Sequence, residues 1–176
     1  MPVIDADQLA RVTVAPGSPA VKRITELFGG SVLAADGSLD RKKVGDMVFA
    51  SASRRRQLEE ILHPEIRRLA EERIANAAVE GHKIVVYMAP LLIEAGVSDR
   101  VAEIWVVTVS PEVQLERLMR RENISRDEAS GIIASQMPLA EKERYGKVVI
   151  DNSGTPEETR RILDEIWERE TGSIDE

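Results

Sequence analysis

The fold of this 176-residue chain is constrained most by two short runs, residues 83–88 and 102–109, in which most side chains are apolar. Successive side chains of a strand point to opposite faces, so such a run is typical of a strand that is covered on both sides. Patterns of helical period precede and follow the two runs. The sequence therefore predicts an α/β fold with a parallel sheet and helices on both faces.

Capping residues locate the helices around these strands. A serine followed by proline, or by an acid three positions on, is typical of a helix start, and glycine often follows a helix end. The predicted starts are Ser18-Pro19, Ser51 or Ser53, His63-Pro64, Ser110-Pro111, Ser125 and Pro156. Gly29 and Gly81 are predicted to end the first and third of these helices, and a further strand is predicted at 148–150.

Polar residues directly follow the predicted strands, and parallel sheets bind ligands at the carboxyl ends of their strands. Asp5 and Asp7 come after the apolar segment 2–4, and Asn152 lies just beyond the last predicted strand. Alternation along the strand predicts that Asp5 and Asp7 share one side. Arg11 would share a helix face with Asp7 if the chain turns helical there.

Composition narrows the possible functions. The net charge of −7 argues against nonspecific nucleic-acid binding, and the absence of cysteine removes disulfides and thiol catalysis. Two histidines are too few for a histidine-rich metal site. No run reaches the length of a membrane span and no charged-then-apolar leader opens the chain, so a cytoplasmic protein is expected. Arginines at 54–56 and 117–126 form either solvated helix faces or sites for small anions.

Eight segments of the chain carry a resemblance to a known family. In chain order they are 3–11, 15–20, 35–41, 62–64, 90–94, 114–117, 134–138 and 150–154. Their order and spacing resemble those of dephospho-coenzyme A kinase over nearly the whole chain. Each segment alone is a weak signal, but together they are specific.

The resemblance implies a P-loop kinase-type parallel sheet in a single kinase-like domain over 1–176. A helical substrate-binding region at about 50–80 and a helical lid at about 112–140 are implied with it. The implied reaction uses ATP and Mg²⁺ to phosphorylate the ribose 3′-hydroxyl of dephospho-CoA, the last step of coenzyme A biosynthesis. Dephospho-CoA and ATP are then the expected partners, with neither nucleic acid nor a membrane.

On the acceptor side, Asp7 resembles the family's catalytic carboxylate, which orients the ribose hydroxyl and accepts its proton. Arg11 would hold substrate phosphate beside it. Alternatively, Asp7 is an acid at a helix N-terminus that only interacts with the helix dipole. Arg11 is alternatively a surface residue that forms an ion pair with Asp7. Asp5 either contacts Mg²⁺ or only shapes the turn.

His63 and Glu94 are the other candidates for substrate binding. Because Pro64 is predicted to begin a helix, His63 is expected to cap or anchor that helix rather than to transfer protons. Glu94 contacts substrate or is structural.

Three residues are candidates on the ATP side. Arg117 and Arg121 would contact ATP phosphates from the lid, since a guanidinium binds phosphate oxygens through two donors at once. Asn152, at a strand end, is a candidate for the adenine side.

The sequence departs from the family pattern in two places. Met88 occupies a strand position at which many members carry an acid that helps to hold Mg²⁺. None of the six lysines is followed by Ser or Thr, so the chain has no Gly-x-x-x-x-Gly-Lys-Ser/Thr loop to cradle phosphates. The family's first strand, P-loop and first helix would precede Pro2, so the chain is expected to be truncated at its N-terminus and inactive as given.

The family's first strand is expected between the strands at 83–88 and 102–109. Its loss would leave two inner edges that either close onto each other or recruit a strand from another chain, and a marginally stable monomer is predicted. Two other functions stay open. One is a noncatalytic module that binds CoA-type nucleotides without ATP, and the other is a different small-molecule kinase of the same fold.

Overall fold

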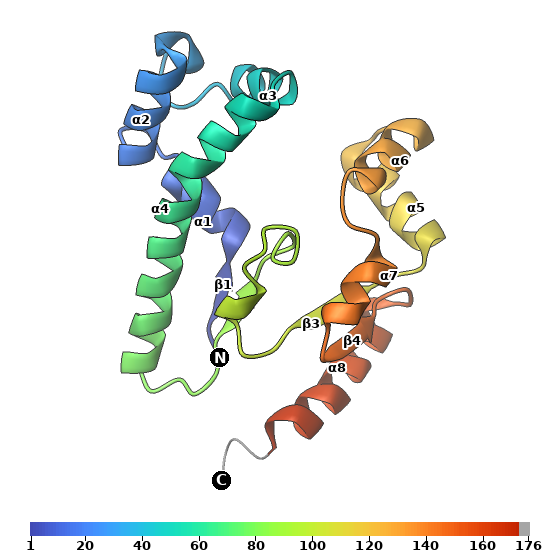
Figure 1. Cartoon of the computed structure of the whole chain (residues 1–176). Helices are drawn as coiled ribbons and strands as arrows, with labels where there is room; N and C mark the ends of the chain where they lie inside the picture. The colour runs from blue at the N-terminus through green and yellow to red at the C-terminus, as the bar shows by residue number, and fades with distance from the viewer. Residues whose placement is uncertain (173–176) are drawn as a thin grey trace. The chain divides into compact units, whose positions relative to one another are not determined.

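The computed structural model describes residues 1–172 and divides the chain into two compact units, which meet in the sequence between Ala89 and Pro90 (Figure 1). The first contains β1 (Val3–Asp5), α1 (Ala6–Thr13), α2 (Pro19–Phe28), α3 (Arg41–Phe49), α4 (Ala52–Val79) and β2 (Val86–Met88). The second contains β3 (Trp105–Thr108), α5 (Pro111–Glu122), α6 (Arg126–Ala134), α7 (Leu139–Lys142), β4 (Val148–Asp151) and α8 (Pro156–Thr171). A single domain over 1–176 stays a prediction.

The serine caps predicted from the sequence are confirmed. Ser18, Ser51, Ser110 and Ser125 each accept a hydrogen bond from a backbone N–H three positions on, which satisfies one of the free donors of the first helical turn. Gly29 follows α2 with a φ of 87°, a left-handed conformation that glycine adopts without strain.

The predicted break at His63-Pro64 is wrong, because α4 is one continuous helix of 28 residues with Pro64 inside it. Proline cannot donate to the carbonyl of Glu60, and its ring crowds that carbonyl, at a cost of about 3 kcal/mol. Packing on both sides of the proline offsets this cost. Ile61 and Ala70 are buried, and α1, α2 and α3 all contact α4 (Figure 1).

Two apolar clusters hold the first unit together. The larger joins α2, α3 and α4 through Ala20, Ile24, Val32, Val44 and Ile61. The smaller joins β1, α1 and α4 through Ile4, Leu9 and Ala70. Because Ile4 and Leu9 are almost fully buried, the junction between β1 and α1, which carries Asp5 and Asp7, is anchored from both sides.

In the first unit β1 and β2 run parallel, with Asp5 opposite Met88. In the second unit β3 and β4 also run parallel, from Trp105 opposite Val148 to Thr108 opposite Asp151. Parallel pairing and the interleaved helices confirm the predicted α/β class. The strands are shorter than the apolar runs at 83–88 and 102–109, since pairing covers only part of each run.

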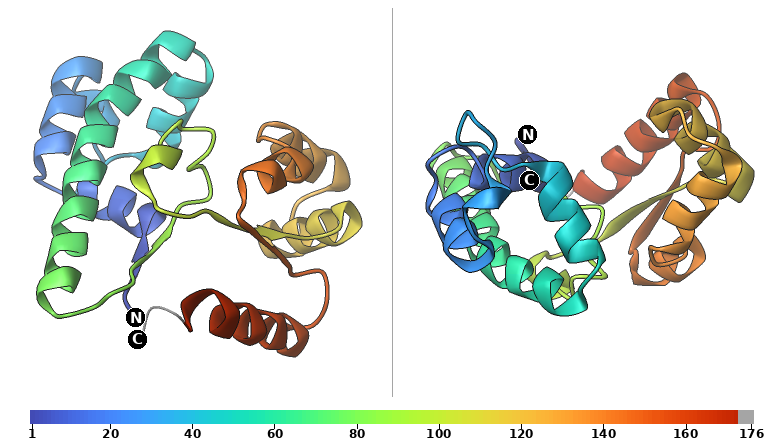
Figure 2. Two further views of the ribbon diagram at one scale, coloured as in Figure 1. Left: turned by 60° about the horizontal axis from the view of Figure 1, so that its bottom comes forward. Right: turned by 90° about the horizontal axis from the view of Figure 1, so that it is seen from above.

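The core of the second unit lies where β4 packs against α8. Val148, Ile150 and Ile166 are buried, with Trp105 of β3 packed against them. The rings of Trp105 and Trp167 meet edge to face at a centroid distance of 6.0 Å. Helices α5 and α6 lie side by side in the same unit (Figure 2).

Within residues 1–172 the strands form two separate two-stranded sheets, β1–β2 and β3–β4. The predicted closure of the two inner strands onto each other concerns one strand from each unit and stays a prediction. Recruitment of a strand from another chain stays a prediction.

Candidate functional site

Asp5 ends β1 and caps α1. Its Oδ1 atom accepts hydrogen bonds from the backbone N–H groups of Asp7 at 2.8 Å and Gln8 at 3.2 Å. The helix starts at Ala6, so strand alternation does not extend to Asp7, and the prediction that the two acids share one side of a strand is wrong. The Asp5 carboxylate has a structural partner, and the chain changes from strand to helix between the two acids.

Asp7 lies exposed in the first turn of α1, and Arg11 lies exposed in the last turn. Positions four apart lie on one helix face, as predicted. Among residues 1–172 no ion pair joins the two side chains. The Asp7 carboxylate is thus available to a ligand at the carboxyl end of β1.

A cavity of about 520 Å³ lies next to Arg11 in the first unit. Its walls are the turn at 14–16 after α1, the Ser38-Leu39 segment, and Arg41, the first residue of α3. Two guanidinium groups and no carboxylate line it, so the cavity favours an anion.

Neither Met88 nor His63 lines this cavity. Met88 is the register partner of Asp5 and is 48% exposed, so a thioether stands beside the strand-end carboxylate. His63 is exposed in the middle of α4 and caps no helix, because α4 runs through it. A role for His63 in substrate binding stays a prediction.

In the second unit Glu94 is bound to another protein group. Its Oε1 atom accepts from the Lys142 ammonium at 2.6 Å, and Lys142 also donates to the carbonyl of Pro90 at 3.1 Å. The two side chains are only 22% and 11% exposed. Burial by itself raises the pKa of Glu94, but the hydrogen bond and charge of Lys142 outweigh it and leave that pKa below its ordinary value. Glu94 therefore ties the segment after β2 to α7.

Arg117 of α5 reaches the turn between β4 and α8. Its guanidinium donates to three consecutive carbonyls, of Asn152 at 2.6 Å, Ser153 at 3.4 Å and Gly154 at 2.9 Å. The Asn152 side chain accepts from the Thr159 hydroxyl at 2.8 Å. Two of the three candidates for the ATP side, Arg117 and Asn152, thus lie together at one turn.

Arg121, one helical turn beyond Arg117, is 73% exposed, and within residues 1–172 it pairs only with its neighbour Glu122 at 2.7 Å. An exposed pair between adjacent residues contributes little to stability. Arg121 is therefore free to exchange this partner for a ligand phosphate.

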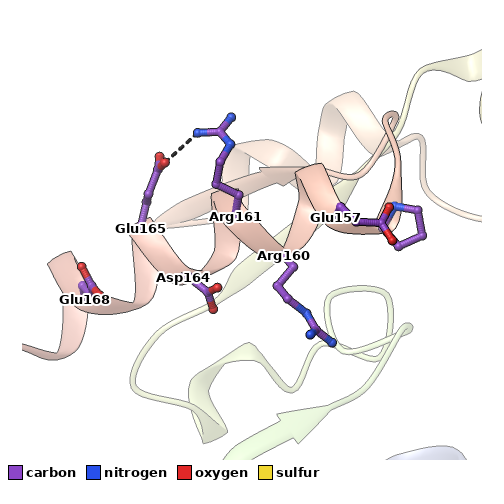
Figure 3. A pocket seen from close by; sticks show the side chains of 7 residues that line it. Glu157, Arg160, Arg161, Asp164, Glu165 and Glu168 are labelled. Atoms are coloured by element: carbon purple, nitrogen blue, oxygen red, sulfur yellow. Dashed lines mark hydrogen bonds and ion pairs between the residues drawn. The ribbon is translucent and has the colours of Figure 1, made fainter.

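A second hollow, of about 470 Å³, runs along α8 (Figure 3). Four acids and two arginines form its charged walls, and Arg161 already pairs with Glu165 at 2.6 Å. All of its lining residues belong to one helix face, and none is a candidate from the sequence.

Sequence reasoning missed two cations at these sites. Lys142 is a lone lysine in a short helix, and no sequence motif indicates its pairing with Glu94. Arg41 lies inside the segment 35–41 that carried the family resemblance. The clustering of Arg41 with Arg11 depends on α1 and α3 both packing against α4.

The structure gives no protein-only metal site among residues 1–172, where no three His, Asp or Glu side chains converge. Asp5 is engaged with backbone N–H groups and Met88 offers no oxygen, so the residues at this strand edge do not fit a Mg²⁺ site by themselves. No helix within the same range has the length and apolar character needed to cross a membrane.

Comparisons with known proteins agree on one family. The dephospho-CoA kinase family model matches residues 1–158. A dephospho-CoA kinase of Geobacter sulfurreducens is 53% identical over 165 residues, which are 94% of this chain and 84% of that protein. One from Geobacter metallireducens is 50% identical over 165 residues, covering 94% and 82%.

Two solved structures resemble this one. TT1252 from Thermus thermophilus superposes with a TM-score of 0.78 at 29% identity, covering 96% of this chain and 84% of that one. A dephospho-CoA kinase from Campylobacter jejuni superposes with a TM-score of 0.69 at 24% identity, covering 98% and 87%, and supports the fold. The P-loop kinase-type class expected from the sequence is confirmed, and the chain belongs to the dephospho-CoA kinase family.

Proposed function

We propose that the residues of this chain provide the acceptor side of an ATP-dependent phosphoryl transfer to the ribose 3′-hydroxyl of dephospho-CoA. The observation that carries this proposal is the position of Asp7, an exposed acid with no side-chain partner within residues 1–172, at the carboxyl end of a parallel strand. Relatives that are about half identical are named dephospho-CoA kinase.

Asp7 is the proposed proton acceptor. A carboxylate within hydrogen-bond reach of the ribose hydroxyl orients it and takes its proton as the oxygen attacks phosphorus, a contribution of about 10²–10⁴ in rate. Arg11, four residues on along the same helix face, would bind phosphate of the acceptor and hold the ribose in place.

The proposed ATP side lies in the second unit. Arg121 would contact phosphates, since its only ion-pair partner in the described chain is exposed Glu122. Arg117 would fix the turn at 152–154 that receives the adenine, and it keeps N–H groups beyond those bound to carbonyls. The Glu94–Lys142 pair is proposed to be structural rather than a substrate contact.

The 176 residues contain no Gly-x-x-x-x-Gly-Lys-Ser/Thr loop, so we propose that this polypeptide alone does not transfer phosphate. The test is an assay for the 3′-phosphorylated product with ATP, Mg²⁺ and dephospho-CoA, with the Geobacter sulfurreducens relative as positive control. Turnover by residues 1–176 comparable with that control would refute the proposal.

The missing motif favours one second function, a noncatalytic module that binds CoA-type nucleotides and not ATP. Calorimetry separates the two proposals. If the chain provides the acceptor side of a kinase, it should gain ATP binding when a strand, a P-loop and a helix are joined ahead of Pro2. If it is a noncatalytic module, the extended chain should still bind dephospho-CoA and not ATP. The cytoplasm is the proposed location for either function.

A further inference from the structure

The cavity beside α1 has a feature that the family resemblance did not assign, namely a second arginine. Arg11 and Arg41 both line it, and they lie 30 positions apart in the sequence, on two different helices. We propose that Arg41 acts with Arg11 as a binding site for the diphosphate of the acceptor nucleotide. This inference rests on the proposed acceptor function and adds a residue to it.

The charge of the cavity supports an anionic ligand. Neither Arg11 nor Arg41 forms an ion pair within the described residues, and the other lining residues are apolar apart from Ser38. Two guanidinium groups on one cavity repel each other, and a diphosphate between them removes that repulsion. The planar fork of each arginine also matches two phosphate oxygens at once.

The acids nearest to Arg41 in sequence are engaged elsewhere. Asp40 caps α3 through the N–H of Lys43 at 3.1 Å and pairs with the Lys43 ammonium at 3.1 Å. Asp36 accepts from the N–H of Ser38 at 3.0 Å and from its hydroxyl at 2.6 Å. The Ser38 hydroxyl proton is thus used within its own turn, and the two arginines remain the donors for an anion.

The position of the cavity relative to Asp7 suits a nucleotide whose reacting hydroxyl is at Asp7. Arg11 follows Asp7 by four residues, a rise of about 6 Å along α1. A ribose carries its 3′-hydroxyl and its 5′-phosphate on one ring, so both lie within the span of a single nucleotide. Arg41, at the first position of α3, adds the positive end of that helix to the same side of the cavity.

The test is calorimetric titration of residues 1–176 with inorganic diphosphate. Arg41→Gln is compared with Lys42→Gln, which removes the same charge from the next, exposed residue outside the cavity lining. We expect Arg41→Gln to weaken diphosphate binding at least about tenfold, as for a lost hydrogen bond to a charged group, and Lys42→Gln to change it little. Equal binding by the two variants, or no binding by the unsubstituted chain, would overturn the site.

A second titration with dephospho-CoA and with adenosine separates the site from the proposed function. Arg41→Gln should weaken dephospho-CoA and leave adenosine unchanged, since adenosine carries no phosphate. Binding of diphosphate through Arg41 without binding of dephospho-CoA would refute the acceptor function and leave the anion site intact. All variants should keep the unfolding midpoint of the unsubstituted chain, because the Arg41 side chain is exposed.

Discussion

The two units of the molecule use their polar side chains in different ways. In the first unit Asp7, Arg11 and Arg41 are exposed, and their side chains make no ion pair among the described residues. In the second unit Glu94 and Arg117 are bound to other protein groups. Groups that are free can bind a ligand and be replaced with little loss of stability, whereas groups that are paired define the shape around them. The contrast predicts that substitutions of Asp7, Arg11 and Arg41 affect binding and catalysis, and that substitutions of Glu94, its partner Lys142 and Arg117 affect folding.

The largest effect is expected for Asp7→Asn in a polypeptide to which a strand, a P-loop and a helix are joined ahead of Pro2. Loss of the proton acceptor should lower the rate of phosphoryl transfer about 10²–10⁴-fold with the unfolding midpoint nearly unchanged. Glu26→Gln, which neutralises an exposed acid of α2, is the control and should keep full activity. An active Asp7→Asn enzyme would place the proton acceptor elsewhere.

Lys142→Ala is expected to lower the free energy of unfolding by about 3 kcal/mol, because it leaves the mostly buried Glu94 carboxylate without its partner. The control is Lys147→Ala. Lys147 is half exposed and pairs with Glu103 at 2.6 Å and Glu170 at 3.1 Å, so water screens these ion pairs and its removal should cost much less. Urea unfolding measures the stability of both variants. Similar losses of unfolding free energy would show that burial does not increase the contribution of the Glu94–Lys142 pair to stability.

Arg117→Lys is expected to cost about 2 kcal/mol in the same measurement. A single ammonium cannot reach the three carbonyls of 152–154 that the guanidinium fork binds. The matched change Arg121→Lys, at an exposed position one turn away, should fall within about 0.5 kcal/mol. If both variants unfold alike, the turn at 152–154 does not depend on Arg117.

Asp5→Ala is a smaller test in the first unit, where it removes a helix cap and not a catalytic group. The lost hydrogen bonds to the N–H groups of Asp7 and Gln8 should cost about 1 kcal/mol. Asp5→Asn keeps an oxygen acceptor and should retain most of that stability, which urea unfolding would resolve. If both variants are as stable as the unsubstituted chain, the Asp5 cap does not contribute to the free energy of unfolding.

The smallest effect concerns pH. Because the pKa of Glu94 in the folded chain lies below its ordinary value of 4.5, its charged form stabilises the fold above that pH. That contribution is lost as the pH falls through the lower folded pKa. The difference in unfolding free energy between the unsubstituted chain and Glu94→Gln should therefore shrink below pH 4.5, and a difference that is constant with pH would contradict the role of the charge.

The sequence predicted most local features because their signals are local. Ser18, Ser110 and Ser125 with their neighbours were sufficient to locate helix starts. Predictions failed where tertiary packing overrides a local signal. Pro64 reads as a helix start, but contacts of Ile61 and Ala70 with other elements hold α4 continuous across it.

The candidate site was predicted unevenly for the same reason. Asp7 and Arg11 are four residues apart on one helix, so spacing alone placed them on one face. Arg41 and Lys142 depend on contacts between segments far apart in sequence, and no local pattern reveals such contacts. The arginine cluster makes Arg117 a candidate for ATP contacts, but its three carbonyl partners at 152–154 come from a segment about 35 residues away and have no local signal.

The edge-to-face pair of Trp105 and Trp167 gives the chain a built-in optical probe. These are its two tryptophans, and both lie in the second unit. Indole fluorescence therefore reports on the contact between β3 and α8 and not on α1 to α4, whereas far-ultraviolet circular dichroism sums the helices of both units. Coincident midpoints from the two signals would mean a single cooperative transition, and separate midpoints would mean that each unit unfolds by itself.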